Sequence, residues 1–311
     1  MFIQKRLAIV SVLGILMSAC SPNVGNGRGD STASVGKVPP TPDPDQFLEV
    51  ANFLEDEEVD SIINIESFLP DGSKRKTGIK PVPMDGDDFR RQNLDNAYWP
   101  KVSVMNGDFR GASMRTVKCK KCNLKNSDFR TADIRWSVFD FGDLSNSNFS
   151  QAKLFHVHVN YANLEHCDFR GANMFGMEGH HAVMRNCDMT NALMKDSEFP
   201  DADFKYSLLV HTRLIRAVMT GSDFSYTNCT DADFSGGGFA HVNFSHAVLK
   251  GANFQGCRLQ YTNFEGADIE GCNFYGAHME KTNFEGAINI PKSIRDMMVD
   301  GKVTGNVSER D

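Results

Sequence analysis

Every fifth residue of this chain is a large apolar one over about 200 residues. This register has 40 positions from Phe89 to Phe284, and 37 of them are Phe, Leu, Met, Ile, Val or Trp. The three exceptions are Cys119, Gly179 and Cys229, and 16 of the 23 Phe in the chain fall on the register. A period of five fits neither the 3.6-residue turn of a helix nor the alternation of a strand. The region must therefore fold as an internal repeat.

A second register lies two residues earlier and carries small side chains. From Asp87 to Thr282, 37 of 40 positions are Ala, Ser, Thr, Cys, Gly or Val, and no insertion or deletion shifts the phase. Asp or Asn frequently precedes the large residue, as in Ala252-Asn253-Phe254. This pattern resembles the pentapeptide-repeat family, and the resemblance covers residues 87–287, about two-thirds of the chain.

The resemblance implies an all-β solenoid: a right-handed quadrilateral β-helix with one pentapeptide per side and four sides per coil. Forty repeats then give about ten coils. In such a coil one large and one small side chain per repeat point inward, and equivalent residues twenty apart lie on one another. We therefore predict two aromatic ladders, Phe89–Phe109–Phe129–Phe149–Phe169 and Phe204–Phe224–Phe244–Phe264–Phe284.

The start of the chain is predicted to be an export signal and not part of this fold. Lys5 and Arg6 precede an apolar run, Leu7–Met17, which is about half the ~20 residues that a membrane-spanning helix needs. The small-residue cleavage site Met17-Ser18-Ala19-Cys20 follows. This order resembles the bacterial lipoprotein signal, in which the Cys receives diacylglycerol and the chain is cleaved just before it.

The lipoprotein resemblance implies a signal peptide at residues 1–19 and a lipidated, palmitate-bearing Cys20 as the first mature residue. Ser21 after the Cys implies sorting to the outer membrane of the bacterial cell envelope. The alternatives are an ordinary secretory signal with an accidental Cys, and a cytosolic protein. Residues 20–45 are mainly Gly, Ser, Asn and Pro, so they bury too little apolar area to fold and are predicted to be a flexible tether.

The segments on either side of the repeats are predicted to cap its two ends. Residues 46–86 contain apolar residues at helical spacing, with Asp56 as a candidate N-cap, which suits a helical N-terminal cap or a docking segment for a partner. Residues 288–311 are predicted to form a short capping helix over Pro291–Val299 and a loose tail. Solenoids need such caps for solubility. The apolar Met297 and Met298 leave a homodimer through the C-terminal end open.

Seven cysteines follow Cys20, and all of them fall on the two inward registers: Cys119, Cys122, Cys167, Cys187, Cys229, Cys257 and Cys272. Disulfides in an oxidising periplasm and a redox or metal motif at Cys119-Lys120-Lys121-Cys122 are the functional interpretations. The register favours Cys acting as a small buried hydrophobe. Cys167 and Cys187 stack on adjacent coils about 4.8 Å apart, which exceeds the preferred Cβ separation of a disulfide, ~3.8 Å.

Histidines raise the question of a metal site on one outer face. His158, Glu178 and Glu198 are spaced by twenty, and His180 follows Glu178. A flat face does not force three or four ligands to converge within the ~2.1 Å that zinc requires, so we predict solvated histidines and no metal or cofactor. Gly179 interrupts the large register here, which makes a bulge at His180–His181 conceivable.

The sequence predicts a non-enzyme, since the continuous rod has no insertion to form a concave site. A gyrase-binding DNA mimic needs a densely negative rod, whereas residues 87–287 carry 24 acidic and 21 basic side chains. Eight basic residues cluster in the first coils, where nucleic acid, anionic lipid or an acidic partner are candidate ligands: Arg110, Arg115, Lys118, Lys120, Lys121, Lys125, Arg130 and Arg135. Residues 201–287 are acidic, so no continuous basic stripe is expected and we predict no nucleic-acid binding.

The function that these features favour is a membrane-anchored, non-enzymatic binding or scaffolding lipoprotein. It would use the repeat rod to contact a partner protein and Cys20 to reach the membrane. The alternative from another class is a translocated effector or virulence-associated pentapeptide-repeat protein, which a lipoprotein signal disfavours.

Overall fold

The computed structural model of the chain describes residues 83–303 and 305–308. The chain divides into two compact units, Met1–Ile63 and Asn64–Asp311, and every described residue belongs to the second. The predicted signal peptide (1–19), the tether with Cys20 (20–45) and nearly all of the predicted N-terminal cap (46–86) lie outside the described residues.

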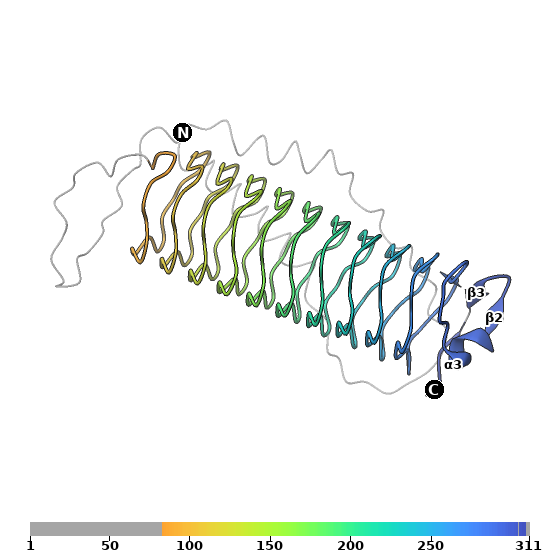
Figure 1. Cartoon of the computed structure of the whole chain (residues 1–311). Coiled ribbons are helices and arrows are strands. Elements are labelled where there is room, and N and C mark those ends of the chain that lie inside the picture. The colour runs from red at the N-terminus through yellow and green to blue at the C-terminus, as the bar shows by residue number, and fades with distance from the viewer. Residues whose placement is uncertain (1–82, 304, 309–311) are drawn as a thin grey trace, which may run out of the picture. The chain divides into compact units, whose positions relative to one another are not determined.

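Parallel main-chain pairing between successive coils builds the repeat region. Every fifth residue from Asp88 to Asp268 forms a parallel bridge with the residue twenty positions later. At one rung, the Phe89 N–H donates to the Asp108 carbonyl at 2.8 Å and the Asp108 N–H donates to the Asp87 carbonyl at 3.0 Å. Figure 1 shows the coils stacked side by side from orange to blue. The predicted right-handed quadrilateral β-helix is confirmed.

One left-handed residue turns the chain at each corner. Every fifth residue from Gly86 to Gly286 has a φ between 50° and 78°. Gly enters this region without strain and Asn and Asp enter it more easily than other residues, yet His and Tyr also occupy many of these corners. The surrounding ladder therefore imposes the corner conformation, and large side chains at corners project outward.

The large register forms the interior that the sequence predicts. In the early ladder the ring centroids of Phe89, Phe109 and Phe129 are 4.8 and 4.7 Å apart, with nearly parallel planes. In the later ladder the Phe204–Phe224 distance is 4.5 Å. Phe109, Phe129, Phe204 and Phe224 are fully buried. Both predicted aromatic ladders are confirmed.

Gly179 breaks the residue pattern without disturbing the coil. A Cβ atom built on Gly179 would lie 2.2 Å from the Phe199 ring, so that ring occupies the space left by the missing side chain. The Gly179 N–H still donates to the Glu198 carbonyl at 2.8 Å, and the His181 N–H to the Pro200 carbonyl at 3.0 Å. The bulge considered at His180–His181 does not form, because the ladder bonds on both sides of it are intact.

The C-terminal end differs in detail from the prediction. Strand β1 (Thr282–Asn283), helix α3 (Lys292–Arg295), strand β2 (Met298–Val299) and strand β3 (Lys302–Val303) follow in order. The three strands form an antiparallel sheet in the order β1–β3–β2. The helix predicted over Pro291–Val299 is therefore wrong beyond Arg295, and the predicted loose tail is wrong for residues 302, 303 and 305–307.

A two-residue hairpin accounts for this correction. Asp300 and Gly301 both have positive φ, 48° and 73°, as a type I′ turn requires, and Asp-Gly is a preferred pair for it. The turn pairs Val299 with Lys302 and brings Val303 onto the last coil, where its side chain is fully buried. Tertiary packing thus overrides the helical spacing of Met297 and Met298. Within residues 83–303 and 305–308 no helix has the length and apolarity to cross a lipid bilayer.

Candidate functional site

Cys20, the predicted lipidation site, lies outside the described residues. The other seven cysteines are free thiols with buried side chains. In the small register they bond like Ser and Thr: the thiols of Cys187 and Cys257 donate to carbonyls 23 residues earlier, both at 3.0 Å, and the Thr262 hydroxyl does so at 2.8 Å. Burial raises the pKa of the Cys187 and Cys229 thiols to about 12. Such thiols stay protonated and unreactive at neutral pH.

The Cys119-Lys120-Lys121-Cys122 motif is part of the interior. Cys119 fills a large position with no exposed surface and Cys122 a small one, where its thiol donates to the Cys119 carbonyl. Burial raises the pKa of Cys119 well above its usual value. A redox pair of the thioredoxin type needs an accessible, low-pKa thiol, so the geometry here favours packing.

The histidines and acids of the predicted outer face lie in a row. The His158 Nδ1 atom is 3.2 Å from the Glu178 carboxylate, and Glu178 bridges to Glu198 on the next coil. Across residues 83–303 and 305–308, no three His, Cys, Asp or Glu side chains converge as metal ligands would. The His158–Glu178 pair is half-exposed and belongs to the surface described below.

The basic cluster is distributed around the coils and is largely neutralised. Six of its eight members form ion pairs with Asp: Arg110–Asp108, Arg115–Asp95, Lys120–Asp140, Lys125–Asp143, Arg130–Asp128 and Arg135–Asp133. Arg110 donates to the carboxylate of Asp108 at 2.6 Å, and this side-chain hydrogen bond holds the pKa of Asp108 below its usual value. Pairs of this kind reduce the phosphate-binding charge that nucleic acid requires.

Exposed aromatic side chains gather along the edges of one outer side in the middle coils. We call this surface the aromatic face. It consists of one side of three successive coils and the two corners that flank it: Val138, His158 and Glu178 on the side, Trp136, Phe155 and Phe175 at one corner, and Phe141, Tyr161 and His181 at the other. Trp136, Phe141 and Tyr161 are 46%, 41% and 50% exposed. Large aromatic side chains are usually much more buried than this in folded proteins.

The rings at each corner of the aromatic face support one another. Phe141 stacks on Tyr161 at 5.0 Å and Tyr161 on His181 at 4.9 Å. At the other corner Phe155 stacks on Phe175 at 5.1 Å and meets the edge of Trp136 at 5.8 Å. Ring pairs at these distances contribute about 0.5–1.5 kcal/mol each. The two rows are therefore rigid ridges that border Val138, His158 and Glu178.

A smaller apolar surface lies on another side of the later coils. Tyr206 and Tyr226 stack at a corner with centroids 5.3 Å apart, and Tyr226 stacks on His246 at 5.0 Å. Leu208 and Val248 lie on the adjoining side and are 43% and 36% exposed. This surface has one aromatic row where the aromatic face has two.

The Trp, Phe and Tyr residues of the aromatic face were missed at the level of sequence, although a signal was present. Trp136, Phe141 and Tyr161 all stand two residues after the large inward position, and His181 does so as well. That register is the left-handed corner, whose side chain must point outward. Aromatic residues there, twenty apart, indicate surface stacks.

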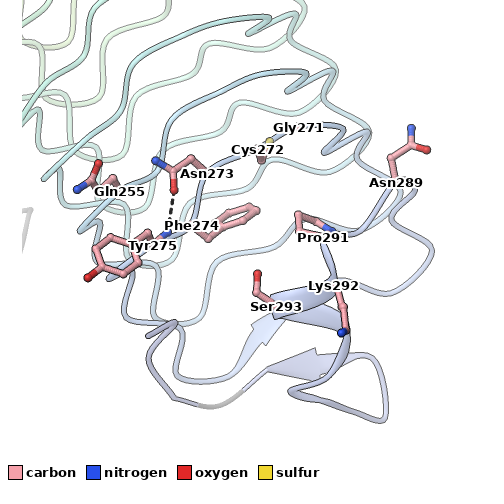
Figure 2. Close-up of a pocket in the computed structure, with 10 residues that line it drawn as sticks. All are labelled: Gln255, Gly271, Cys272, Asn273, Phe274, Tyr275, Asn289, Pro291, Lys292 and Ser293. Atoms are coloured by element: carbon pink, nitrogen blue, oxygen red, sulfur yellow. Dashed lines mark hydrogen bonds between the residues drawn. The ribbon is translucent and has the colours of Figure 1, made fainter. Parts of the chain in front are cut away.

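Two hollows lie on the described coils. One of about 590 Å³ lies over the first coils beside Arg90, Arg91 and Arg110. The other, of about 470 Å³, lies between the last coil and α3. The first hollow is lined mainly by polar and Arg side chains, and the second has Lys292 and Ser293 in its wall (Figure 2).

Comparison with known families agrees with the repeat. The family of pentapeptide repeats in eight copies matches residues 132–171, and the family described as a pentapeptide repeat region matches residues 209–284. Neither family is one of enzymes. No curated protein matches the chain.

Solved structures of similar proteins include HetL of the cyanobacterium Nostoc, a pentapeptide-repeat protein involved in heterocyst differentiation regulation. It is 19% identical, with 69% of this chain and 94% of that chain covered and a TM-score of 0.45. QnrB1, a plasmid-mediated fluoroquinolone resistance protein, is 19% identical over 56% of this chain and 91% of that chain, with a TM-score of 0.45. Similarity at this level carries no functional argument. On the two matched regions and the repeat itself, the chain belongs to the pentapeptide-repeat family.

Proposed function

We propose that this protein is a non-enzymatic binding rod that holds a partner protein at the bacterial cell envelope. The lipid on Cys20 would anchor it in the outer membrane, residues 20–45 would serve as the tether, and the coils would present the binding surface. The aromatic face is the observation that supports the proposal that the rod binds a protein. The anchoring part is supported by the order of charge, apolar run and small residues that ends in Cys20.

The chemistry of the aromatic face suits a protein partner. Trp and Tyr are enriched among the residues that dominate binding energy at interfaces, and exposed apolar patches mark such interfaces. The ring stacks are ordered before binding, so little side-chain entropy is lost when a partner covers them. His158 and Glu178 between the ridges offer polar groups for orientation.

Charged residues at the two ends of the aromatic face would set the orientation of a bound partner. Lys118 and Lys121 lie on its N-terminal side, whereas Glu198 and Asp201 lie on its C-terminal side. A partner surface with an apolar centre, acidic at one end and basic at the other, would be complementary to this arrangement. Such complementarity sets orientation and association rate more than affinity.

The binding part is tested with paired variants of the full-length protein. Trp136→Ala combined with Tyr161→Ala should weaken cross-linking to the envelope partner by at least about tenfold, since hot-spot residues contribute ~2 kcal/mol or more. Tyr206→Ala combined with Tyr226→Ala removes equally exposed rings from another corner and should leave it unchanged. If both double variants lost cross-linking to the same extent, or if neither lost any, the aromatic face would have no role in binding.

The anchoring part is tested separately. Mass spectrometry should find diacylglycerol on Cys20 at the start of the mature chain, and Cys20→Ser should release the protein from the membrane fraction. A Cys20→Ser protein that still sediments with membranes would show that the anchor lies elsewhere. It would leave the binding result unaffected.

A further inference from the structure

The side of the rod at the centre of the aromatic face has charges of opposite sign at its two ends. Successive coils place Lys118, Val138, His158, Glu178 and Glu198 along it. Lys118 and Glu198 are exposed, and neither forms an ion pair with another residue of the described ranges, 83–303 and 305–308. Both charges are therefore available to a binding partner.

One corner of the aromatic face repeats this order. Lys121, Phe141, Tyr161, His181 and Asp201 follow one another along it. The Lys121 ammonium lies 5.9 Å from the centre of the Phe141 ring, and the His181 Nε2 atom lies 4.0 Å from the Asp201 carboxylate. Side and corner thus both run from a basic residue to an acidic one, with the middle residue on the same coil.

This order is complementary to its own reverse. A second copy of the face can be turned end for end about an axis through the coil of His158 and Tyr161. Lys118, 40 residues before His158, then lies opposite Glu198, 40 residues after it. Lys121 lies opposite Asp201 in the same way. Because a two-fold interface contains each contact twice, each of these pairs forms twice.

We propose that the aromatic face binds the aromatic face of a second copy of this chain, with the two rods antiparallel. The proposal rests on the proposed function, in which the face binds a protein, and identifies that protein as the same chain. A parallel pair of rods would place Lys118 on Lys118 and Glu198 on Glu198. Repulsion between like charges disfavours that arrangement.

The antiparallel register also brings apolar and aromatic groups together. Trp136 of one protomer lies opposite Phe175 of its partner, and the two Tyr161 rings meet at the axis. Val138 lies opposite Glu178, whose carboxylate is already paired with an imidazole, since His158 Nδ1 is 3.2 Å away. The ring ridges therefore meet at the centre of the interface, and the unpaired charges meet at its ends, as in a typical interface with an apolar core and a polar rim.

The size of this surface matches that of a stable dimer. The five coils between Arg115 and Asp201 present about 25 outward residues on this side and its two corners. A standard protein interface uses ~20–30 residues on each partner.

Native mass spectrometry of the full-length protein in detergent tests the dimer. The unmodified protein should be dimeric at micromolar concentration. Trp136→Ala combined with Tyr161→Ala should weaken the dimer by at least about 100-fold, because aromatic residues at the centre dominate binding energy and a symmetric dimer loses each of them twice. Tyr206→Ala combined with Tyr226→Ala should leave it unchanged.

Charge reversal tests the antiparallel register. Lys118→Glu and Glu198→Lys should each weaken the dimer by about tenfold or more, since each substitution places like charges opposite one another at both ends. Mixing the two variants, one of them ¹⁵N-labelled, should restore a mixed dimer, because opposite charges then meet again. Arg213→Glu reverses an exposed charge on another side of the rod and should have no effect.

The proposal would be overturned by a monomeric full-length protein, or by mixed variants that dimerise no better than either variant alone. In that case the proposed function would stand if Trp136→Ala with Tyr161→Ala still weakened cross-linking to an envelope protein of different sequence. If this double variant changed neither the dimer nor the cross-linking, both the proposal and the proposed function would be wrong.

Discussion

Replacing Phe244 by Ala removes the centre of the later aromatic ladder. Phe244 has no exposed surface. Its ring lies 5.2 Å from that of Phe224 and 5.3 Å from that of Phe264. Phe254 also meets it edge-on at 5.7 Å. The truncation therefore opens a cavity between two coils and ends several ring contacts at once.

The expected cost follows from this environment. A buried Phe→Ala change costs ~3–5 kcal/mol through lost transfer energy and the residual cavity, and stacked ring pairs contribute a further ~0.5–1.5 kcal/mol each. The main-chain hydrogen bonds on both sides keep the coil from collapsing into the cavity. The expected loss of stability is therefore in the upper part of the ~3–5 kcal/mol range. In a solenoid each coil contacts only its neighbours, and the loss falls on the adjoining coil interfaces.

Hydrogen exchange resolved along the chain measures this loss. Amides at residues 220–270 should exchange roughly 10²- to 10⁴-fold faster, since each 1.4 kcal/mol is tenfold. Amides of the early ladder around Phe129 should be unchanged. Tyr226→Ala is the matched control, because it truncates an aromatic side chain of the same coils that is 53% exposed. If Phe244→Ala leaves exchange at residues 220–270 unchanged, the inward register is wrong.

Three further predictions follow from the coils. Gly179→Ala should lower the free energy of unfolding, measured in urea, by ~1–3 kcal/mol, because the added methyl group overpacks against the Phe199 ring. Gly238→Ala is the control: its Cβ would make only an ordinary contact, so the free energy of unfolding should change by less than ~0.5 kcal/mol. Thiol titration of the mature protein, in which the proposed lipid blocks Cys20, should find few reactive groups in the native state and seven after denaturation without reductant; a lower count would reveal disulfides. The Arg90 side-chain hydrogen bond lowers the pKa of Asp88 to about 2, so the unfolded chain binds the proton first as the pH falls. The ionised Asp88 therefore stabilises the folded chain, and this contribution to stability is complete above about pH 4 and lost toward pH 2. Arg90→Gln should raise the Asp88 pKa in an NMR titration.

The interior of the rod was predictable from sequence because its two inward registers are local. A side chain such as Phe224 or Ala252 points inward by its place within five residues, whatever its neighbours are. The four-sided coil then places residues twenty apart in contact, so the aromatic ladders and the buried cysteines follow from counting. The phase is unbroken, which leaves no alternative register.

The outer surface could not be obtained in the same way. The charge of Arg115 alone indicates a ligand for nucleic acid or lipid, but its partner Asp95 lies twenty residues earlier and neutralises it. Likewise Trp136 and Phe155 are single aromatic residues in the sequence and become one ridge only when the coils stack. Outward residues acquire their roles from contacts between coils.

The sequence by itself determined which two residues of each repeat point inward, since a period of five is held without a break, and its resemblance to the pentapeptide-repeat family implied the four-sided coil. Only the tertiary structure decided what happens where the period stops. After Ile290 the chain can follow helical spacing at Met297–Met298 or the Asp300–Gly301 turn. The unpaired edge of the last coil selects the turn, because Val303 and Val307 bury apolar surface and close backbone hydrogen bonds there. A capping segment has no repeat of its own, so its structure depends on the surface that it covers.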